Sequence, residues 1–145
     1  MTTPAASPTS RAAILRKWLP VIAWSAAIFI LSTASFSAVD TLRTIEKGTH
    51  AIIPGASVAA ISVIHLLARK GAHFAVYGIL FRLLVRGPMA KRRGLALLIC
   101  IGYAMTDEFH QIFVPGRGAS LYDVALDSSG ALFSLYLLNF FREFA

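Results

Sequence analysis

Side chains able to bind an anion, accept a proton or ligate a cation are concentrated between Arg69 and Asp127. Four of the seven carboxylates of the chain lie between Asp107 and Asp127 alone. Ionisable groups in an apolar chain are costly unless they are paired, hydrated or used, so their concentration predicts a functional site. The candidates are Arg69, Lys70, His73, Tyr77, Asp107, Glu108, His110, Gln111, Arg117, Asp123 and Asp127.

The first group of candidates follows a helical spacing. Lys70, His73 and Tyr77 recur at i, i+3 and i+7, which places an ammonium, an imidazole and a phenol on one helix face. Lys70 suits a phosphate or carboxylate, or it is a lysine extending to the membrane boundary. His73 is a candidate acid/base group or an internal partner of Asp107 or Asp123. Tyr77 is expected to brace the site.

The second group is the segment TDEFHQ, from Thr106 to Gln111. On a continuous helix Asp107 and Gln111 face the same way, whereas Glu108 and His110 diverge from them. The adjacent carboxylates of Asp107 and Glu108 could form a metal-binding or acid/base pair, or a solvated helix end. His110 is expected to be exposed.

The third group begins with VPGRGAS, whose proline and glycines predict a sharp turn holding Arg117. That guanidinium could bind a phosphate, a carboxylate or an internal acid. Asp123 and Asp127 then share a helix face at i and i+4. Asp127 must pair with a base such as Lys70, His73 or Arg117, be protonated, or bind a cation.

Small residues continue the same helix beyond Asp127. Ser128, Ser129, Gly130, Ala131 and Ser134 form a surface without bulk, and Gly130 and Ser134 have the small-xxx-small spacing. Such surfaces let helix backbones approach closely in a membrane. We therefore expect close helix packing here.

The composition of the chain indicates which secondary-structure elements position these residues. Hydrophobic residues make up 57% of the 145 and charged residues 14%, with mean hydropathy +0.67, which indicates an integral membrane protein. We predict an all-α bundle of about four transmembrane helices with an interfacial or re-entrant helix after the first. Residues 1–10 are predicted to be a disordered tail and residues 11–145 a single membrane domain. The predicted spans are 18–34, 72–85, 94–105 and 122–141, and the extra helix lies before Arg69.

Basic residues predict the orientation. They precede the first span, follow the last and fill the RGPMAKRR loop between the second and third, so both termini are expected in the cytoplasm. The candidate site then lies at the extracytoplasmic boundary. The basic residues that give the chain its net charge of +7 flank the predicted spans and do not alternate with aromatic residues, which argues against a nucleic-acid partner. The single Cys100 excludes an intramolecular disulfide.

RKGAHFAVYGIL followed by TDEFHQIFVPGRGASLYDVALDSSGAL resembles the VanZ-like family of small bacterial membrane proteins. The resemblance covers roughly residues 69–134, with Asp127 where many members have Asn. It implies a multi-pass protein of the bacterial cytoplasmic membrane, a role at the cell envelope, and a possible link to resistance to the glycopeptide teicoplanin. The matching motif positions include Lys70, His73, Tyr77, Asp107, Glu108, Gln111, Arg117, Asp123 and Asp127.

Three functions follow as hypotheses. In the first, the site binds an anionic lipid or cell-wall-precursor group through Lys70, Tyr77, Glu108, Gln111, Arg117 and Asp127. In the second, a membrane enzyme acts on a lipid-linked phosphate or headgroup with His73, Asp107 and Asp123 as catalytic groups. The third is proton-coupled transport. No cofactor motif is evident, a divalent metal is possible, and membrane lipids are the expected partners; the sequence does not define the oligomeric state.

Overall fold

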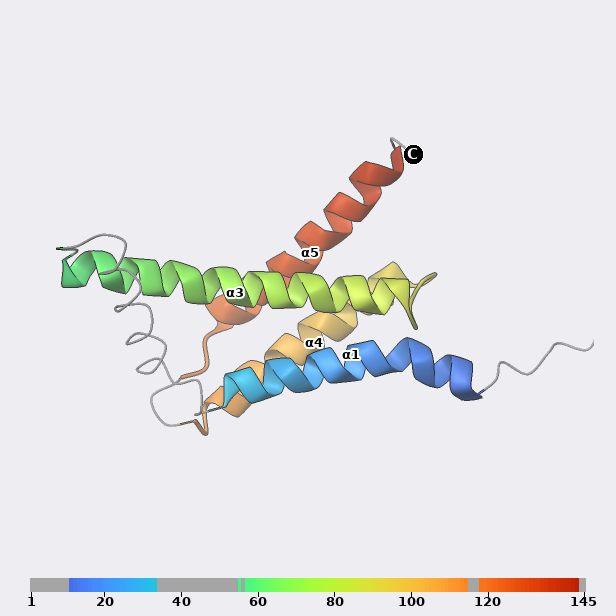
Figure 1. The fold of residues 1–145 in the computed structure, drawn as a ribbon, viewed down its shortest axis with the longest axis horizontal. Helices are drawn as coiled ribbons and strands as arrows, with labels where there is room; N and C mark the ends of the chain where they lie inside the picture. The colour runs from blue at the N-terminus through green and yellow to red at the C-terminus, as the bar shows by residue number, and fades with distance from the viewer. Residues whose placement is uncertain (1–10, 34–54, 56, 115–117, 144–145) are drawn as a thin grey trace, which may run out of the picture.

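The computed structural model describes residues 11–33, 55, 57–114 and 118–143. These residues form four α-helices and no strand: α1 (Arg11–Ser32), α3 (Val58–Arg86), α4 (Arg93–Gln111) and α5 (Leu121–Glu143) (Figure 1). The predicted all-α class is therefore confirmed for the described part of the chain. The N-terminal tail predicted for residues 1–10 lies outside it.

Helices α1 and α5 are each long and apolar enough to cross a membrane. Helix α1 has 22 residues and contains Pro20, while α5 has 23 residues. Large apolar side chains such as Leu19, Ile22 and Phe133 are exposed on their outer surfaces, as lipid-facing side chains are. Spans in the other two helices remain a prediction.

Helix α3 differs from the expectation of two separate elements. The apolar segment before Arg69 and the predicted second span form one continuous helix of 29 residues. At 1.5 Å per residue it is about 43 Å long, more than the roughly 30 Å hydrocarbon thickness of a bilayer. The Ser57 side chain accepts a hydrogen bond from the Ala60 amide and caps its start. Pro54 and Gly55 therefore precede the helix, and no break separates its two halves.

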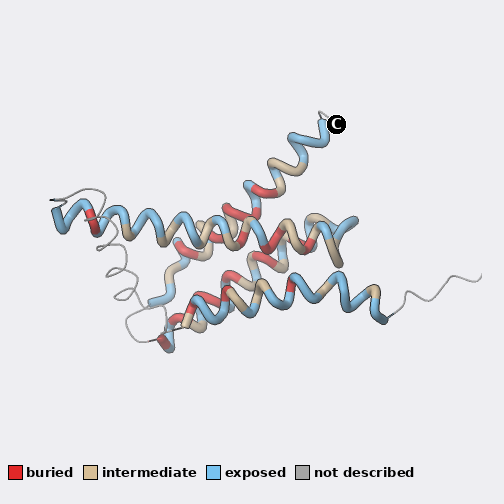
Figure 2. Tube along the Cα trace, in the orientation of Figure 1, coloured by how far each residue is buried: buried red, intermediate tan, exposed pale blue. Residues whose placement is uncertain are grey.

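The core lies where α3, α4 and α5 cross. Tyr77, Phe81 and Leu84 of α3 are buried there with Cys100 of α4 and Ala131 of α5. In Figure 2 buried residues gather at this crossing, whereas the ends of α3 and α5 that extend away from it are largely exposed. Cys100 is fully buried within this core and packs among its apolar side chains.

Helices α3 and α5 approach each other through small residues. A Cβ added at Gly130 would lie 2.0 Å from the Phe74 carbonyl oxygen, and one added at Gly78 would lie 3.2 Å from the Gly130 carbonyl oxygen. Gly130 and Ser134 are both buried. The prediction that the small residues of α5 serve close packing is confirmed. This contact lies next to His73 and Asp127 and so fixes the distance between them.

Helix α1 joins the bundle through polar contacts as well as apolar packing. The Trp24 indole N–H donates to the Val76 carbonyl oxygen of α3 at 2.9 Å. The Tyr103 hydroxyl of α4 donates to the Ser25 carbonyl oxygen at 2.6 Å. Both bonds use side chains that are partly buried, so they fix the position of α1 against α3 and α4.

Candidate functional site

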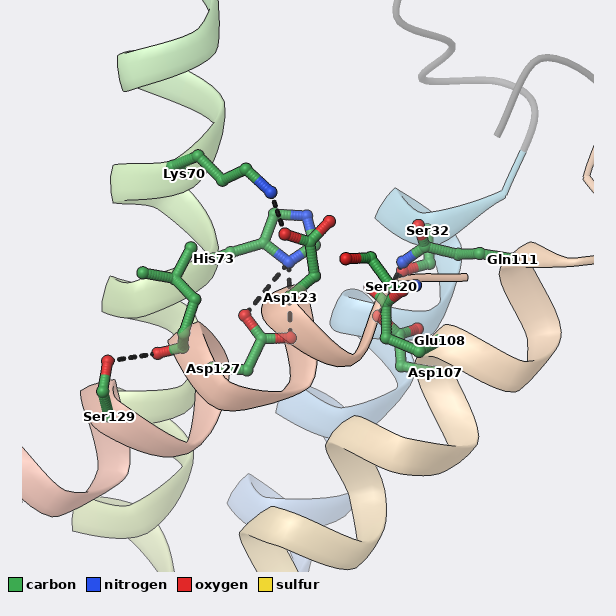
Figure 3. Close-up of polar contacts among 11 residues, drawn as sticks. Ser32, Lys70, His73, Asp107, Glu108, Gln111, Ser120, Asp123, Asp127 and Ser129 are labelled. Atoms are coloured by element: carbon green, nitrogen blue, oxygen red, sulfur yellow. Dashed lines mark hydrogen bonds and ion pairs between the residues drawn. The ribbon is translucent and has the colours of Figure 1, made fainter. Parts of the chain in front are cut away.

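Two side-chain pairs connect α3 to the start of α5. The Lys70 ammonium contacts an Asp123 carboxylate oxygen, and the His73 Nδ1 atom lies 3.2 Å from Asp127 Oδ1 (Figure 3). The two bases lie three residues apart on one face of α3, and the two acids lie four residues apart on one face of α5. The Lys70 side chain keeps 27% of its exposure, whereas that of Asp127 keeps none. Lys70 thus marks the open end of the site and Asp127 its closed end.

The last turn of α4 supplies the opposite wall. Asp107 Oδ2 accepts hydrogen bonds from the Ser32 hydroxyl at 2.8 Å and from Gln111 Nε2 at 3.2 Å. Asp107 and Gln111 therefore share a face, as their spacing predicts. Glu108 is also buried, and its Oε2 accepts a hydrogen bond from the Ser120 amide at 2.8 Å. Although its spacing places Glu108 on a different helix face from Asp107 and Gln111, the segment entering α5 contacts it through Ser120, and Glu108 lies buried at the same end of α4.

Burial changes the protonation behaviour of the groups at the edge of the site. Burial raises the pKa of Glu108, partly offset by its hydrogen bond from the Ser120 backbone. Partial burial, and next the neighbouring Arg69, lower the pKa of Lys70. Both shifts favour the neutral form of the side chain. A cation bound near Glu108, or an anion bound near Lys70, would therefore stabilise the charged form of that side chain.

Several buried polar atoms of the site have no hydrogen-bond partner among the described residues. They are Tyr77 Oη, Asp107 Oδ1 and Glu108 Oε1. Leaving such an atom unpaired costs about 1–3 kcal/mol, more when it belongs to a charged group. Each residue involved interacts electrostatically with Asp127 or Asp107. The site thus has unused capacity for hydrogen bonds or metal coordination.

An apolar groove of about 350 Å³ lies between α3 and α5. Phe74, Gly78, Phe133 and Leu137 contribute to its walls, and Arg82 is the single charged residue that lines it. Phe74 immediately follows His73, so the groove begins beside the polar site. A polar pocket next to an apolar groove suits an amphiphilic molecule.

The structure brings together most of the residues that the sequence singles out. Lys70, His73, Tyr77, Asp107, Glu108, Gln111, Asp123 and Asp127 all lie at the meeting of α3, α4 and α5. The sequence leaves Asp107, Asp123 and Asp127 open as partners of His73. In the structure the partner is Asp127. Arg117 lies outside the described residues. His110, expected to be exposed, is half-buried with its ring centroid 4.5 Å from that of Phe29.

Ser32 is a site residue that the sequence reasoning missed. It ends α1, is 3% exposed, and donates to the Asp107 carboxylate 75 positions away. A serine followed by a threonine at the end of an apolar helix is the only local signal. Since such residues are ordinary at a helix end, the contact could not be inferred without the packing of α1 on α4.

The fold and the site together define a helical membrane protein with a buried, carboxylate-rich polar site at one end of its bundle. The VanZ/LLP1 family model matches residues 17–142. The chain therefore belongs to the VanZ/LLP1 family, and it is a membrane protein of the cell envelope. Comparison with curated proteins gives no match, and comparison with solved structures gives none either.

Proposed function

We propose that this protein binds the anionic headgroup of an envelope lipid or lipid-linked cell-wall precursor at the extracytoplasmic end of its bundle. The observation that carries the proposal is the adjacency of the polar site and the apolar groove. The headgroup would meet Lys70 while a hydrocarbon chain lies along the groove beside Phe74. Anionic groups form strong charge-assisted hydrogen bonds with such an amine.

Lys70 is suited to this role because it is not fully committed to the protein. Its side chain is partly exposed, it is paired with Asp123, and its Nζ atom lies 5.4 Å from the centroid of the exposed Tyr122 ring. An incoming phosphate or carboxylate would compete with Asp123 for the ammonium. The tyrosine ring stabilises the cation in either state.

Lipid binding tests the proposal. The protein in nanodiscs of phosphatidylcholine would be titrated with phosphatidylglycerol or a short-chain prenyl phosphate, and binding followed by native mass spectrometry. We expect Lys70→Ala to weaken binding about tenfold, or about 1.4 kcal/mol, and Lys91→Ala to leave it unchanged. Lys91 is exposed in the turn between α3 and α4, away from the site. Equal binding by wild type and Lys70→Ala would contradict the proposal.

A second variant separates a direct contact from a change in site charge. Lys70→Ala leaves Asp123 unpaired, which by itself repels an anion. Lys70→Ala/Asp123→Asn removes that charge as well. We expect this double variant to remain weakened, because the amine that contacts the anion is still missing. Full recovery would show that Lys70 acts only by neutralising Asp123.

A second candidate function is hydrolysis or transfer at a lipid-linked phosphate. The specific observation in its favour is His73, held by the fully buried Asp127 and flanked by Asp107; a carboxylate that orients an imidazole supports acid/base chemistry. Mass spectrometry of envelope lipids and precursors should compare cells lacking the protein, cells carrying it, and cells carrying Asp107→Asn at matched abundance. A species that changes with the protein and reverts with the variant supports turnover; unchanged pools support binding.

A further inference from the structure

We infer that His73, Asp107 and Asp127 form a binding site for a divalent metal cation. One potential ligand atom from each residue lies within 4.8 Å of the other two. The three side chains come from α3, α4 and α5, so a bound cation would connect all three helices. The site needs no residue from the parts of the chain outside the described ranges.

The spacing of the ligand atoms fits a shared cation after a small contraction. Ligands about 2.1 Å from an octahedral metal lie roughly 3 to 4 Å from one another. The His73 Nδ1 and Asp127 Oδ1 atoms are already 3.2 Å apart, a distance at which neighbouring ligands of one ion lie. Because all three candidate ligand atoms lie within 4.8 Å of one another, side-chain rotations that move them by about 1–2 Å are enough to reach this spacing.

A second observation points to a ligand independently of this cluster. Tyr77 lies one helical turn from His73 on the same face, is 0% exposed, and its hydroxyl has no partner among the described residues. It interacts electrostatically with both Asp107 and Asp127. A water bound to the cation would give this hydroxyl a partner. A second uncommitted atom, Asp107 Oδ1, is available for coordination because Ser32 and Gln111 both bond to Oδ2.

Charge favours a cation at this position. The described site contains four carboxylates, and only Lys70 and His73 oppose them directly. Lys70 is engaged with Asp123, which leaves Asp107 and Asp127 with a single imidazole between them. Adding two positive charges there removes the repulsion between these carboxylates.

The donor set indicates the kind of metal. Two carboxylates select hard cations such as Mg²⁺ and Mn²⁺, and an imidazole shifts the preference toward the transition metals. Mn²⁺ accepts both ligand types and is the probe of choice. The cation would also offset the negative charge of Asp107 and Asp127, which otherwise repels an anionic headgroup. That consequence rests on the proposed function, whereas cation binding itself does not.

The test uses the full chain in detergent, without added lipid, titrated with Mn²⁺ and followed by electron paramagnetic resonance of the free ion. We expect one saturable site per chain, weakened at least tenfold in Asp107→Asn and in Asp127→Asn. Glu143→Gln, an exposed carboxylate at the end of α5, should bind as wild type does. Absence of saturable binding, or equal affinity in all four proteins, would overturn the inference.

A further variant keeps the test decisive if the asparagine variants fold poorly. His73→Cys, made together with Cys100→Ala, places a soft thiolate in the proposed ligand set. We expect this variant to bind Cd²⁺ with a thiolate charge-transfer absorption that Cys100→Ala alone lacks. No such absorption at saturating Cd²⁺ would count against a metal site. The Mn²⁺ titration contains no added lipid, so it does not depend on the lipid-binding experiment. If the protein binds Mn²⁺ but fails to bind lipid in nanodiscs, only the proposed function is rejected.

Discussion

His73 and Asp127 stand 54 positions apart in the sequence and meet at 3.2 Å between Nδ1 and Oδ1. The contact joins the middle of α3 to the second turn of α5. Among the described residues His73 is the only side chain with which Asp127 forms a hydrogen bond, and the Asp127 side chain has no solvent exposure. The stability of the bundle and the chemistry of its site therefore depend on the same pair.

The first prediction concerns this pair. His73→Leu removes the hydrogen-bond partner of the fully buried Asp127 carboxyl group, so it should lower the free energy of unfolding by about 1–3 kcal/mol. His73→Leu/Asp127→Leu also removes the carboxyl group left without a partner and should be more stable than His73→Leu alone. Denaturant unfolding in detergent micelles, followed by circular dichroism, measures both. Losses that simply add would show that the two side chains do not interact.

The second prediction concerns the close contact that holds α3 against α5. A methyl group at Gly130 would overlap the Phe74 backbone, which cannot rotate away as a side chain can. Gly130→Ala should therefore force the helices apart and cost about 1–3 kcal/mol of stability. It should also lengthen the His73–Asp127 contact, because Phe74 follows His73 directly.

Gly102 provides the matched control for Gly130. It lies within α4, and an added Cβ there would meet nothing within 4 Å. Gly102→Ala should be neutral or stabilise the protein by up to about 1 kcal/mol, since alanine favours a helix more than glycine does. Thermal unfolding of both variants in one detergent measures the difference. A similar midpoint for the two would refute the close-packing explanation.

The third prediction concerns the contact of α1 with the site. Ser32→Ala removes a hydrogen bond to a buried carboxylate oxygen and should cost about 1–3 kcal/mol. Ser62→Ala, at an exposed position of α3, should change stability by less than about 0.5 kcal/mol. The comparison is again made by unfolding in detergent. If both serines behave alike, Asp107 does not depend on α1.

Sequence periodicity predicted the part of the site that lies within single helices. The faces shared by Lys70, His73 and Tyr77, and by Asp107 and Gln111, follow from residue spacing alone. It did not predict which base meets which acid, because Lys70–Asp123 and His73–Asp127 depend on how α3 and α5 align. Glu108 shows the same limit, since its hydrogen-bond donor, Ser120, belongs to the segment that leads into the next helix.

The helix boundaries show a different limit of the sequence. The sequence predicts an interfacial or re-entrant helix separate from the second span, yet Val58–Arg86 is one helix. Ser57 caps its start, and the charges of Arg69 and Lys70 do not end it. Local polarity marks where a helix leaves an apolar environment, and only tertiary packing decides whether the helix itself continues.

The last prediction concerns topology, on which the proposed extracytoplasmic position of the site depends. In a Cys100→Ala background, cysteines would be placed one at a time at Ala119 and Ala90, both exposed and at opposite ends of α4. Intact cells would be treated with a membrane-impermeant maleimide. We expect labelling at position 119 and none at position 90, because the basic residues around Lys91 favour the cytoplasm. Lysed cells, in which both positions should react, control for access. Labelling at 90 alone would place Lys70 and the groove entrance on the cytoplasmic side, and an extracytoplasmic headgroup would then be the wrong ligand.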